Sequence, residues 1–267
     1  MKRYSTAPRM RTKEQIDHIK KYVSDPYVIE DLINEGEANY LVDMFEEEEV
    51  LKIHKKTGPV TIDWKHDVNT HLYEDPVVQK VLERLEKHIG PFDINAALYF
   101  HCNGPFTLHN DDNYEFAHVY KGITLPLKLH GPGEGDPGLV MFDQFYFHGP
   151  AKFLKGLEDT DPYTYFNKIL TTYEGVEGLT DVPFDEEWRE RYIPHINAKY
   201  LEGLSVHSVM PWIPGNAIVF DSTRIHCATN YKRLGYTNKQ AISIFTRHKR
   251  NSPYYELEAA SNDDAVV

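Results

Sequence analysis

The sequence contains little cysteine: Cys102 and Cys227 are the only two in 267 residues. Small secreted domains that depend on disulfides contain many more, and neither residue belongs to a CxxC pair that would indicate a zinc or redox site. We therefore expect a reduced protein of the cytoplasm in which both thiols are buried packing groups.

The sequence also lacks an apolar run long enough to cross a bilayer, and no apolar segment of the secretory type follows its first residues. Positive charge is scarce as well, because 29 Lys and Arg are outnumbered by 41 Asp and Glu, for a formal net charge of −12. A protein that follows nucleic-acid phosphates needs a basic face. We expect neither a nucleic acid nor a membrane as partner.

No repeat and no linker rich in Pro, Gly and Ser divides the chain, so we predict one domain over residues 25–250. Residues 1–24 begin with a basic stretch and are interpreted as a partly disordered segment, and residues 251–267 as a polar tail. Residues 149–200 are rich in Tyr, Asp and Glu and interrupt the rhythm of predicted strands. We interpret them as an insertion able to cover the mouth of a pocket.

Helices come early in the predicted order of elements. A short strand at Tyr27–Leu32 precedes a helix capped by Asn34, with Glu37 at the capping-box spacing. A second helix begins at Asp75-Pro76, a cap followed by the proline favoured at the first helical position, and ends before Gly90-Pro91.

Short strand patterns separated by Gly, Pro and Asn turns fill the rest of the chain. They are Asn95–Phe100, Phe106–Asp111, Ile123–Leu129, Gly138–Phe142, Leu204–Val209, Ala217–Phe220, Ile225–Ala228 and Ala241–Thr246. Helices followed by many short strands predict an α+β protein, mainly β, with a closed or double-sheet antiparallel core.

A His-x-Asp pattern lies on one predicted strand, at His109 and Asp111. Residues i and i+2 of a strand point to the same face, so both can bind one cation, while Asp112 would point away. The pattern alone is weak, because with 14 His on the order of one such tripeptide arises by chance.

A distant histidine, His226, would complete the site. Two His and one carboxylate on one side of a metal leave positions open for co-substrate and dioxygen, an arrangement typical of non-haem Fe(II) oxygenases. His207, on a predicted strand, and His130, at the end of another, are the alternatives to His226.

The strand after His226 has the character of a cavity wall. A cation and then small residues share one of its faces: Lys239, Ala241, Ser243 and Phe245. Tyr99 stands on the strand just before His109, and His101 shares its face.

In the order Tyr99, His109-x-Asp111, His226 and a cation on the next strand, the sequence resembles the prolyl-hydroxylase-type branch of the Fe(II)/2-oxoglutarate-dependent oxygenases. The segments YVIEDLINEGEANYLVDMFEE and GLVMF are similar to the same branch. The resemblance covers most of residues 25–250, excluding the insertion. It implies a double-stranded β-helix of the jelly-roll or cupin type, with N-terminal helices packed on one sheet.

The resemblance also implies roles for individual residues. His109, Asp111 and His226 occupy the three positions that bind iron. Lys239 falls where the family places the cation that pairs with the distal carboxylate of 2-oxoglutarate, and Tyr99 where a tyrosine hydroxyl reaches the same co-substrate.

Two departures from the family pattern leave an alternative for the cation. The loop between His226 and Lys239 is longer than usual, and a Lys replaces the commoner Arg. Arg247 is therefore the second candidate. A lysine is a point donor without the planar fork of Arg, so Ser243 or Tyr99 would help to orient the co-substrate.

The implied function is that of a dioxygenase that uses Fe(II), 2-oxoglutarate and dioxygen, hydroxylates an amino acid, a peptide side chain or another small molecule, and releases succinate and CO2. Two other interpretations stay open. A cupin-like metal-dependent oxidase would need no cation at Lys239, and in a non-catalytic β-barrel binding module the histidines would be incidental.

Overall fold

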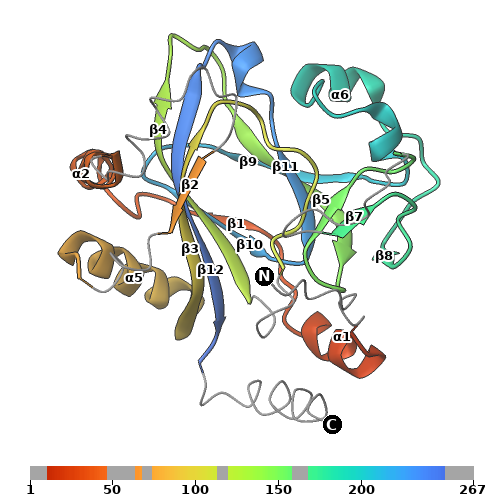
Figure 1. Ribbon diagram of the computed structural model, residues 1–267, viewed down its shortest axis with the longest axis horizontal. Helices are drawn as coiled ribbons and strands as arrows, with labels where there is room; N and C mark the ends of the chain where they lie inside the picture. The colour runs from red at the N-terminus through yellow and green to blue at the C-terminus, as the bar shows by residue number, and fades with distance from the viewer. Residues whose placement is uncertain (1–10, 47–63, 68–73, 113–119, 158–167, 250–267) are drawn as a thin grey trace, which may run out of the picture.

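The structure, a computed structural model, describes residues 11–46, 64–67, 74–112, 120–157 and 168–249 of the chain. Two antiparallel β sheets face each other, and helices cover the outer side of the larger one (Figure 1). This architecture is a double-stranded β-helix, so the mainly β fold predicted from the sequence is confirmed.

The larger sheet has six strands, and each neighbouring pair is antiparallel. Their order across the sheet is β1 (Tyr27–Ile29), β10 (Ala217–Asp221), β4 (Lys121–His130), β12 (Asn238–His248), β3 (Phe92–Cys102) and β2 (Trp64–Asp67). The central strands β4 and β12 are covered on both faces, by the helices on one side and by the smaller sheet on the other.

The smaller sheet is built around β5 (Gly138–Tyr146). It pairs with β11 (Arg224–Ala228) on one side and with β8 (Val176–Glu177) and β9 (Val206–Pro211) on the other. A parallel pair, β6 (Ala151–Phe153) and β7 (Lys168–Leu170), extends the arrangement.

The segment around His109 lies between β6 and β11, because His109 forms single β-bridges with both Lys152 and His226. The strand predicted at Phe106–Asp111 is therefore present only as these isolated bridges and not as a regular strand.

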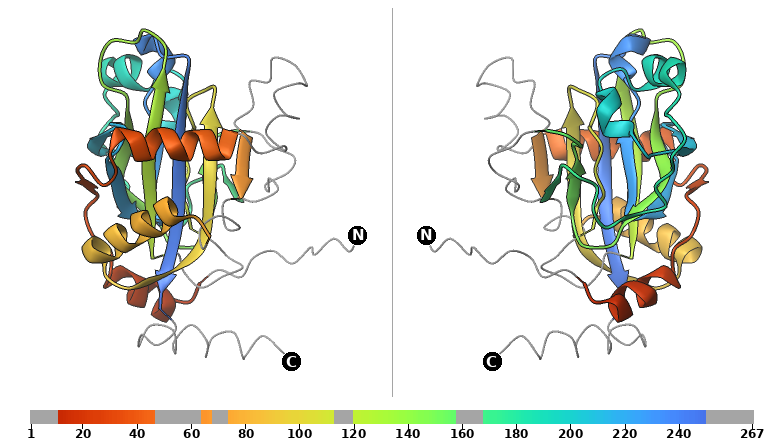
Figure 2. Two further views of the ribbon diagram at one scale, coloured as in Figure 1. Left: turned by 90° about the vertical axis from the view of Figure 1, so that its left-hand side faces the viewer. Right: turned by 90° about the vertical axis from the view of Figure 1, so that its right-hand side faces the viewer.

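Two helices, α2 (Glu35–Glu46) and α5 (Pro76–Ile89), pack against the larger sheet, as Figure 2 shows. Both begin at the predicted caps: Glu37 N donates to Asn34 Oδ1 at 2.9 Å, and Val77 N donates to Asp75 Oδ1 at 2.7 Å. Their apolar faces form one core with the strands, which includes Leu41, Phe45, Val81, Leu85, Ile123, Leu125 and Ile244.

A further helix, α1 (Lys13–Lys20), lies within the segment that the sequence analysis interpreted as partly disordered. Thr12 and Gln15 form a capping box at its start, and its buried Ile16 and Ile19 pack with Phe147. This part of the segment is ordered, and partial disorder of the rest stays a prediction. Residues 1–10 and the predicted tail at 251–267 lie outside the described part of the chain.

The described part of the 149–200 insertion packs on the outer face of the smaller sheet. It contains β6, β7, β8 and α6 (Glu186–Tyr192), and the 3₁₀ turn Ala198–Leu201 follows. α6 lies across the molecule from α2 and α5 (Figure 1). Within the described residues the insertion borders the central cavity only at Pro150, and the covering role expected of it stays a prediction.

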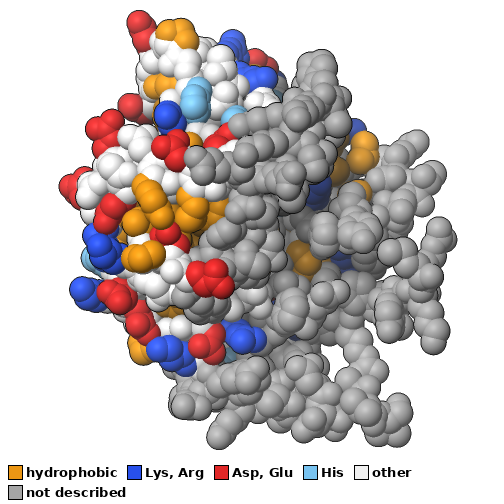
Figure 3. All heavy atoms as spheres, turned by 60° about the vertical axis from the view of Figure 1, so that its left-hand side comes forward, with side chains coloured by type: hydrophobic (Ala, Val, Ile, Leu, Met, Phe, Trp, Pro, Cys, Tyr) orange, Lys and Arg blue, Asp and Glu red, His pale blue; other side chains and the backbone are white. Residues whose placement is uncertain are grey.

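The surface agrees with the low basic content. On the face turned forward in Figure 3, acidic and basic side chains are interspersed, with no broad basic area among the described residues. The absence of a nucleic-acid partner stays a prediction. Among the described helices, none combines the length and apolar character needed to cross a bilayer.

Candidate metal centre

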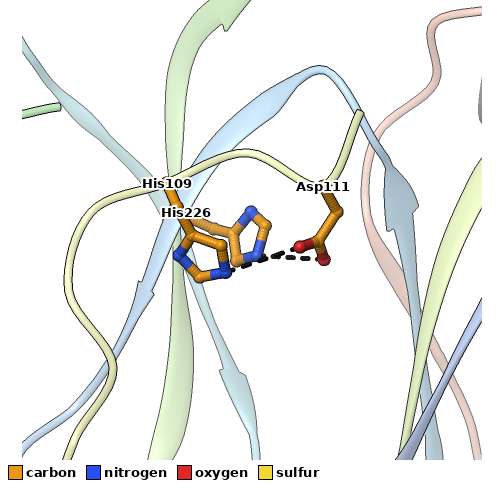
Figure 4. Close-up of side chains that lie close together, drawn as sticks. All are labelled: His109, Asp111 and His226. Carbon is orange, nitrogen blue, oxygen red and sulfur yellow. Dashed lines mark ion pairs between the residues drawn. The ribbon is translucent and has the colours of Figure 1, made fainter. Parts of the chain in front are cut away.

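Three side chains that are distant in the sequence converge between the sheets (Figure 4). His109, Asp111 and His226 each place one ligand atom within 4.8 Å of the others. His109 Nε2 lies 3.5 Å from Asp111 Oδ1, and His226 Nε2 lies 3.4 Å from Asp111 Oδ2. The structure thus brings together the residues that the sequence analysis grouped as metal ligands.

Backbone pairing sets the direction of these side chains. His109 N donates to His226 O at 3.0 Å, and His226 N donates to His109 O at 2.9 Å. Residues that exchange both bonds in this way lie directly opposite each other and face the same side of a sheet. Two residues after His109, Asp111 N donates to Ser222 O at 2.9 Å, and this bond fixes the backbone that carries the Asp111 carboxylate.

The imidazoles are oriented by their other nitrogens. His109 Nδ1 lies 2.8 Å from Thr107 O, and His226 Nδ1 lies 3.0 Å from Arg224 O. A carbonyl oxygen can only accept, so each Nδ1 donates its proton and, in the neutral ring, each Nε2 presents a lone pair to Asp111. Metal-binding histidines in proteins are oriented in this way.

Lone pairs facing a carboxylate repel it unless a cation or an added proton lies between them. Two imidazole nitrogens and one carboxylate suit a divalent transition metal, including Fe(II), with one side of its coordination sphere open. The residues present therefore fit the metal that the sequence analysis inferred.

The His226 ring lies against the Phe220 ring, and Gly122 leaves room for Phe220. The Phe220 ring centroid lies 4.7 Å from that of His226. Gly122 is the cross-strand partner of Phe220, and a Cβ there would lie 2.8 Å from the Phe220 ring. A larger residue at position 122 would push this ring, and the imidazole above it, out of place.

A cavity of about 520 Å³ opens at the three residues and has a mainly apolar lining. Such a volume is in the range of small-molecule sites. Its wall includes the predicted face of β12, with Lys239, Ala241, Ser243 and Phe245. The prediction of this cavity face is confirmed.

Lys239 is 6% exposed, and its Nζ lies 3.7 Å from the centroid of the Trp212 ring. Trp212 also lines the cavity, and its Nε1 has no hydrogen-bond partner among the described residues. From the sequence, Trp212 in MPWIPGN is interpreted as a core packing residue rather than a substrate platform, and its distance from Lys239 along the chain hides the contact. Thr124, the cross-strand partner of Ser243, is a second polar lining residue that it missed.

The expected role of Tyr99 is wrong. Its neighbours Leu98 and Phe100 line the cavity, and strand alternation puts Tyr99 on the helix side of β3. There its ring stacks on Phe45 with centroids 5.0 Å apart, and its hydroxyl donates to Glu46 Oε1 at 3.0 Å. Burial, with Glu46 beside it, raises the pKa of Tyr99 above its ordinary value.

Arg247 and the remaining candidate histidines also lie away from the cavity. Arg247 follows a β-bulge at the far end of β12, where its Nε is 4.0 Å from Asp93 Oδ2. His101 Nδ1 is 2.9 Å from Glu46 Oε1 on the helix side of the sheet. The candidates for replacing His226 are engaged elsewhere too, His130 with Gln240 at 2.7 Å and His207 with Asp25 at 3.2 Å.

Asn95 is a further cavity residue without a sequence signal. The bulge between Phe245 and Thr246 leaves it unpaired in β3, and both Asn95 and the next residue, Ala96, line the cavity. Bulges near functional sites commonly redirect a side chain in this way. Its Nδ2 has no hydrogen-bond partner among the described residues.

A comparison with protein-family models finds no match, and a search of curated proteins finds no relative. Among solved structures, the chain is similar to HygX from Streptomyces hygroscopicus, whose crystal contains nickel and 2-oxoglutarate. The identity is 12% over 90% of this chain and 88% of HygX, and the TM-score is 0.44. It is similar to SnoK, a non-haem alpha-ketoglutarate-dependent carbocyclase from nogalamycin biosynthesis, at 11% identity over 91% and 88% of the two chains, with a TM-score of 0.47. EctD from S. alaskensis, with 2-oxoglutarate and 5-hydroxyectoine, matches at 14% identity over 94% of this chain and 80% of its own, with a TM-score of 0.43.

At these values the likeness concerns the overall fold and assigns no activity. None of the three is described as a prolyl hydroxylase. The narrower resemblance to the prolyl-hydroxylase-type branch therefore gains no support from them.

Proposed function

We propose that this protein is an Fe(II)- and 2-oxoglutarate-dependent dioxygenase that oxidises a small molecule. The observation that carries the proposal is the convergence of His109 Nε2, His226 Nε2 and the Asp111 carboxylate at a cavity that also contains Lys239. Residues 25–250 would form the catalytic domain, interrupted by the 149–200 insertion.

In this proposal His109, Asp111 and His226 hold Fe(II). When bound, Fe(II) with 2-oxoglutarate and dioxygen supplies an oxidation in which 2-oxoglutarate becomes succinate and CO2 while a substrate C–H bond is hydroxylated. The protein's own part is to bind, to orient and to exclude water.

Lys239 would pair with the distal carboxylate of 2-oxoglutarate. Its position against Trp212 limits the freedom of its flexible stem, and low exposure strengthens a charge-assisted contact. The Trp212 Nε1–H is a second donor beside it, and Ser243 is the hydroxyl on the same wall. These groups replace Tyr99 as the residues that would orient the co-substrate.

The remaining lining would receive the substrate. It is apolar at Leu98, Phe100 and Phe245, and it carries neutral polar groups at Asn95 and Thr124. We expect a small molecule or a peptide side chain with both apolar and hydrogen-bonding parts. Cys102 and Cys227 are buried thiols rather than a disulfide, which suits a reducing compartment such as the cytoplasm.

Co-substrate turnover tests the proposal. The protein loaded with Fe(II) is incubated with 2-oxoglutarate, and succinate is measured with and without oxygen and with the competitor N-oxalylglycine. Oxygen-dependent succinate formation that N-oxalylglycine inhibits is the expected result. Metal-dependent oxygen consumption that neither requires 2-oxoglutarate nor is inhibited by N-oxalylglycine would favour the cupin-like oxidase. Failure to bind a divalent metal would favour the non-catalytic barrel.

A further inference from the structure

The backbone just before the metal carboxylate is fixed by Asn110. Its Nδ2 donates to the backbone oxygens of Tyr146 and Gly149 at 3.1 Å each, and its Oδ1 accepts from Ala151 N at 2.7 Å. Asn110 is 1% exposed, so water does not compete for these bonds. They hold the residue before Asp111 in one position.

The residue just after the metal carboxylate is held by an arginine from the N-terminal segment. The Asp112 side chain has no exposed surface, and that of Arg11 is 15% exposed. Arg11 Nη1 donates to Asp112 Oδ2, and Nη2 donates to Oδ1 at 3.1 Å, so the guanidinium meets the carboxylate with both prongs. Nη1 also donates to Phe147 O at 2.7 Å.

Both neighbours of Asp111 are therefore tied to the same short loop, residues 146–149. Asn110 binds the first and last residues of this loop, and Arg11 joins Asp112 to Phe147, one of the two residues between them. Asp111 lies between these two attachments.

Arg11 itself is held in place by the helix that follows it. Thr12 caps α1, and Ile16 and Ile19 pack with the side chain of Phe147, the residue whose carbonyl accepts from Arg11. The arginine thus reaches a partner 101 residues away in the sequence from a fixed base.

We propose that Arg11 is a positioning residue for the metal carboxylate: by holding Asp112 and Phe147 it fixes the direction of Asp111. The inference rests on the proposed metal site. Residues that orient a metal-binding side chain without touching the metal typically contribute 10- to 100-fold to metal affinity. Without Arg11, Asp112 would be a buried carboxylate without this counter-charge, and the backbone after Asp111 would shift to expose it to water.

The sign of the effect separates positioning from plain electrostatics. If Arg11 acted only through its charge, its removal would leave Asp112 negative near the ion and would tighten cation binding. If Arg11 positions Asp111, its removal weakens cation binding. Arg11→Lys sharpens the distinction, since it keeps the charge and loses the two-pronged geometry.

The experiment measures the Kd of Mn(II) by calorimetry on the metal-free, full-length protein, with the Tm of the metal-free form as a second readout. We expect Arg11→Met and Arg11→Lys each to weaken Mn(II) binding by on the order of tenfold. Lys13→Met is the matched control, because it removes one charge from the same segment at a side chain that is 88% exposed. It is expected to stay within twofold of the unaltered protein.

Several results would overturn the inference. A Kd within twofold of the unaltered protein in both Arg11 variants, with or without a lower Tm, would show that Arg11 is at most structural. Tighter binding by Arg11→Met would show an electrostatic role. If Arg11→Met does not fold, Arg11→Lys decides alone. Failure of the unaltered protein to bind Mn(II) would overturn the proposed metal site as well, which distinguishes the two failures.

Discussion

Replacing Lys239 by methionine removes the ammonium group from the cavity and keeps a flexible apolar side chain beside Trp212. Lys239 is 6% exposed and its Nζ lies 3.7 Å from the centroid of that ring, so the change leaves the packing of this wall largely intact. What it removes is the positive charge that the proposed function assigns to the distal carboxylate of 2-oxoglutarate.

The size of the effect follows from the burial. A hydrogen bond to a charged group contributes about 1.5–3 kcal/mol, and at 1.4 kcal/mol for each factor of ten this weakens binding by about 10- to 150-fold. The upper part of this range is expected, because the cavity lining is mainly apolar and screening by water is weak. Lys239→Arg should recover only part of the affinity, since the planar group has to fit against the Trp212 ring.

Calorimetric titration of 2-oxoglutarate into the Mn(II)-loaded protein measures this Kd directly, without a known primary substrate. Arg247→Met is the matched control, because Arg247 lies on the same strand, pairs with Asp93 and does not line the cavity. A Lys239→Met protein that binds 2-oxoglutarate within threefold of the unaltered one, or a larger loss in Arg247→Met, would refute the assignment.

Three further predictions concern the ligands, the rejected tyrosine and pH. His109→Ala and Asp111→Ala should each abolish tight Mn(II) binding in calorimetry while far-UV circular dichroism stays unchanged, and tight binding in either variant would contradict the ligand set. Tyr99→Phe should leave the 2-oxoglutarate Kd unchanged and lower the free energy of unfolding by about 1 kcal/mol in urea titrations. The substitution removes the bond that the hydroxyl donates to Glu46 and the bond that it accepts from Gln240, and a large change in Kd would return Tyr99 to the site. Burial lowers the pKa of His195 from 6.5 to about 4, so the unfolded chain binds the proton more readily, and stability should fall as the pH drops from 6.5 towards 4. His195→Gln should flatten this part of the Tm-versus-pH curve, and an unchanged slope would contradict the assigned cause.

The features that the sequence predicted are those set by local periodicity. The helix caps at Asn34 and Asp75 depend on residues within one turn, and the cavity face of β12 depends only on alternation along one strand. The convergence of His109 and His226 was inferred from motif order rather than from spacing, and the structure supplies the backbone pairing that produces it.

The features that the sequence missed depend on pairing between distant segments. Tyr99 was assigned to the co-substrate because its place in the order of motifs, on the strand before His109, matched a family pattern. The face of β3 is fixed by register instead: Ser243 lies opposite Leu98, and Ala241 lies opposite Phe100. A shift of one residue would have turned Tyr99 inward, and no local signal sets that register. The bulge that places Asn95 at the cavity arises in the same pairing.

The position of Lys239 also bears on the choice between the two metal-dependent functions. A cupin-like oxidase needs the three ligands and an apolar cavity, and for it a leucine or methionine at position 239 would pack against Trp212 as well as a lysine does. Burying an ammonium group carries a desolvation cost that a leucine or methionine avoids, and Lys239 Nζ lies over the rings of Trp212 and Tyr231. An anionic co-substrate in the same cavity would pair with this charge, and 2-oxoglutarate has a carboxylate at each end, one for the proposed metal site and one for Lys239. The buried charge of Lys239 supports the proposed oxygenase over the oxidase. The oxygenase predicts that Lys239→Met weakens 2-oxoglutarate binding, whereas for the oxidase the substitution has no 2-oxoglutarate binding to weaken.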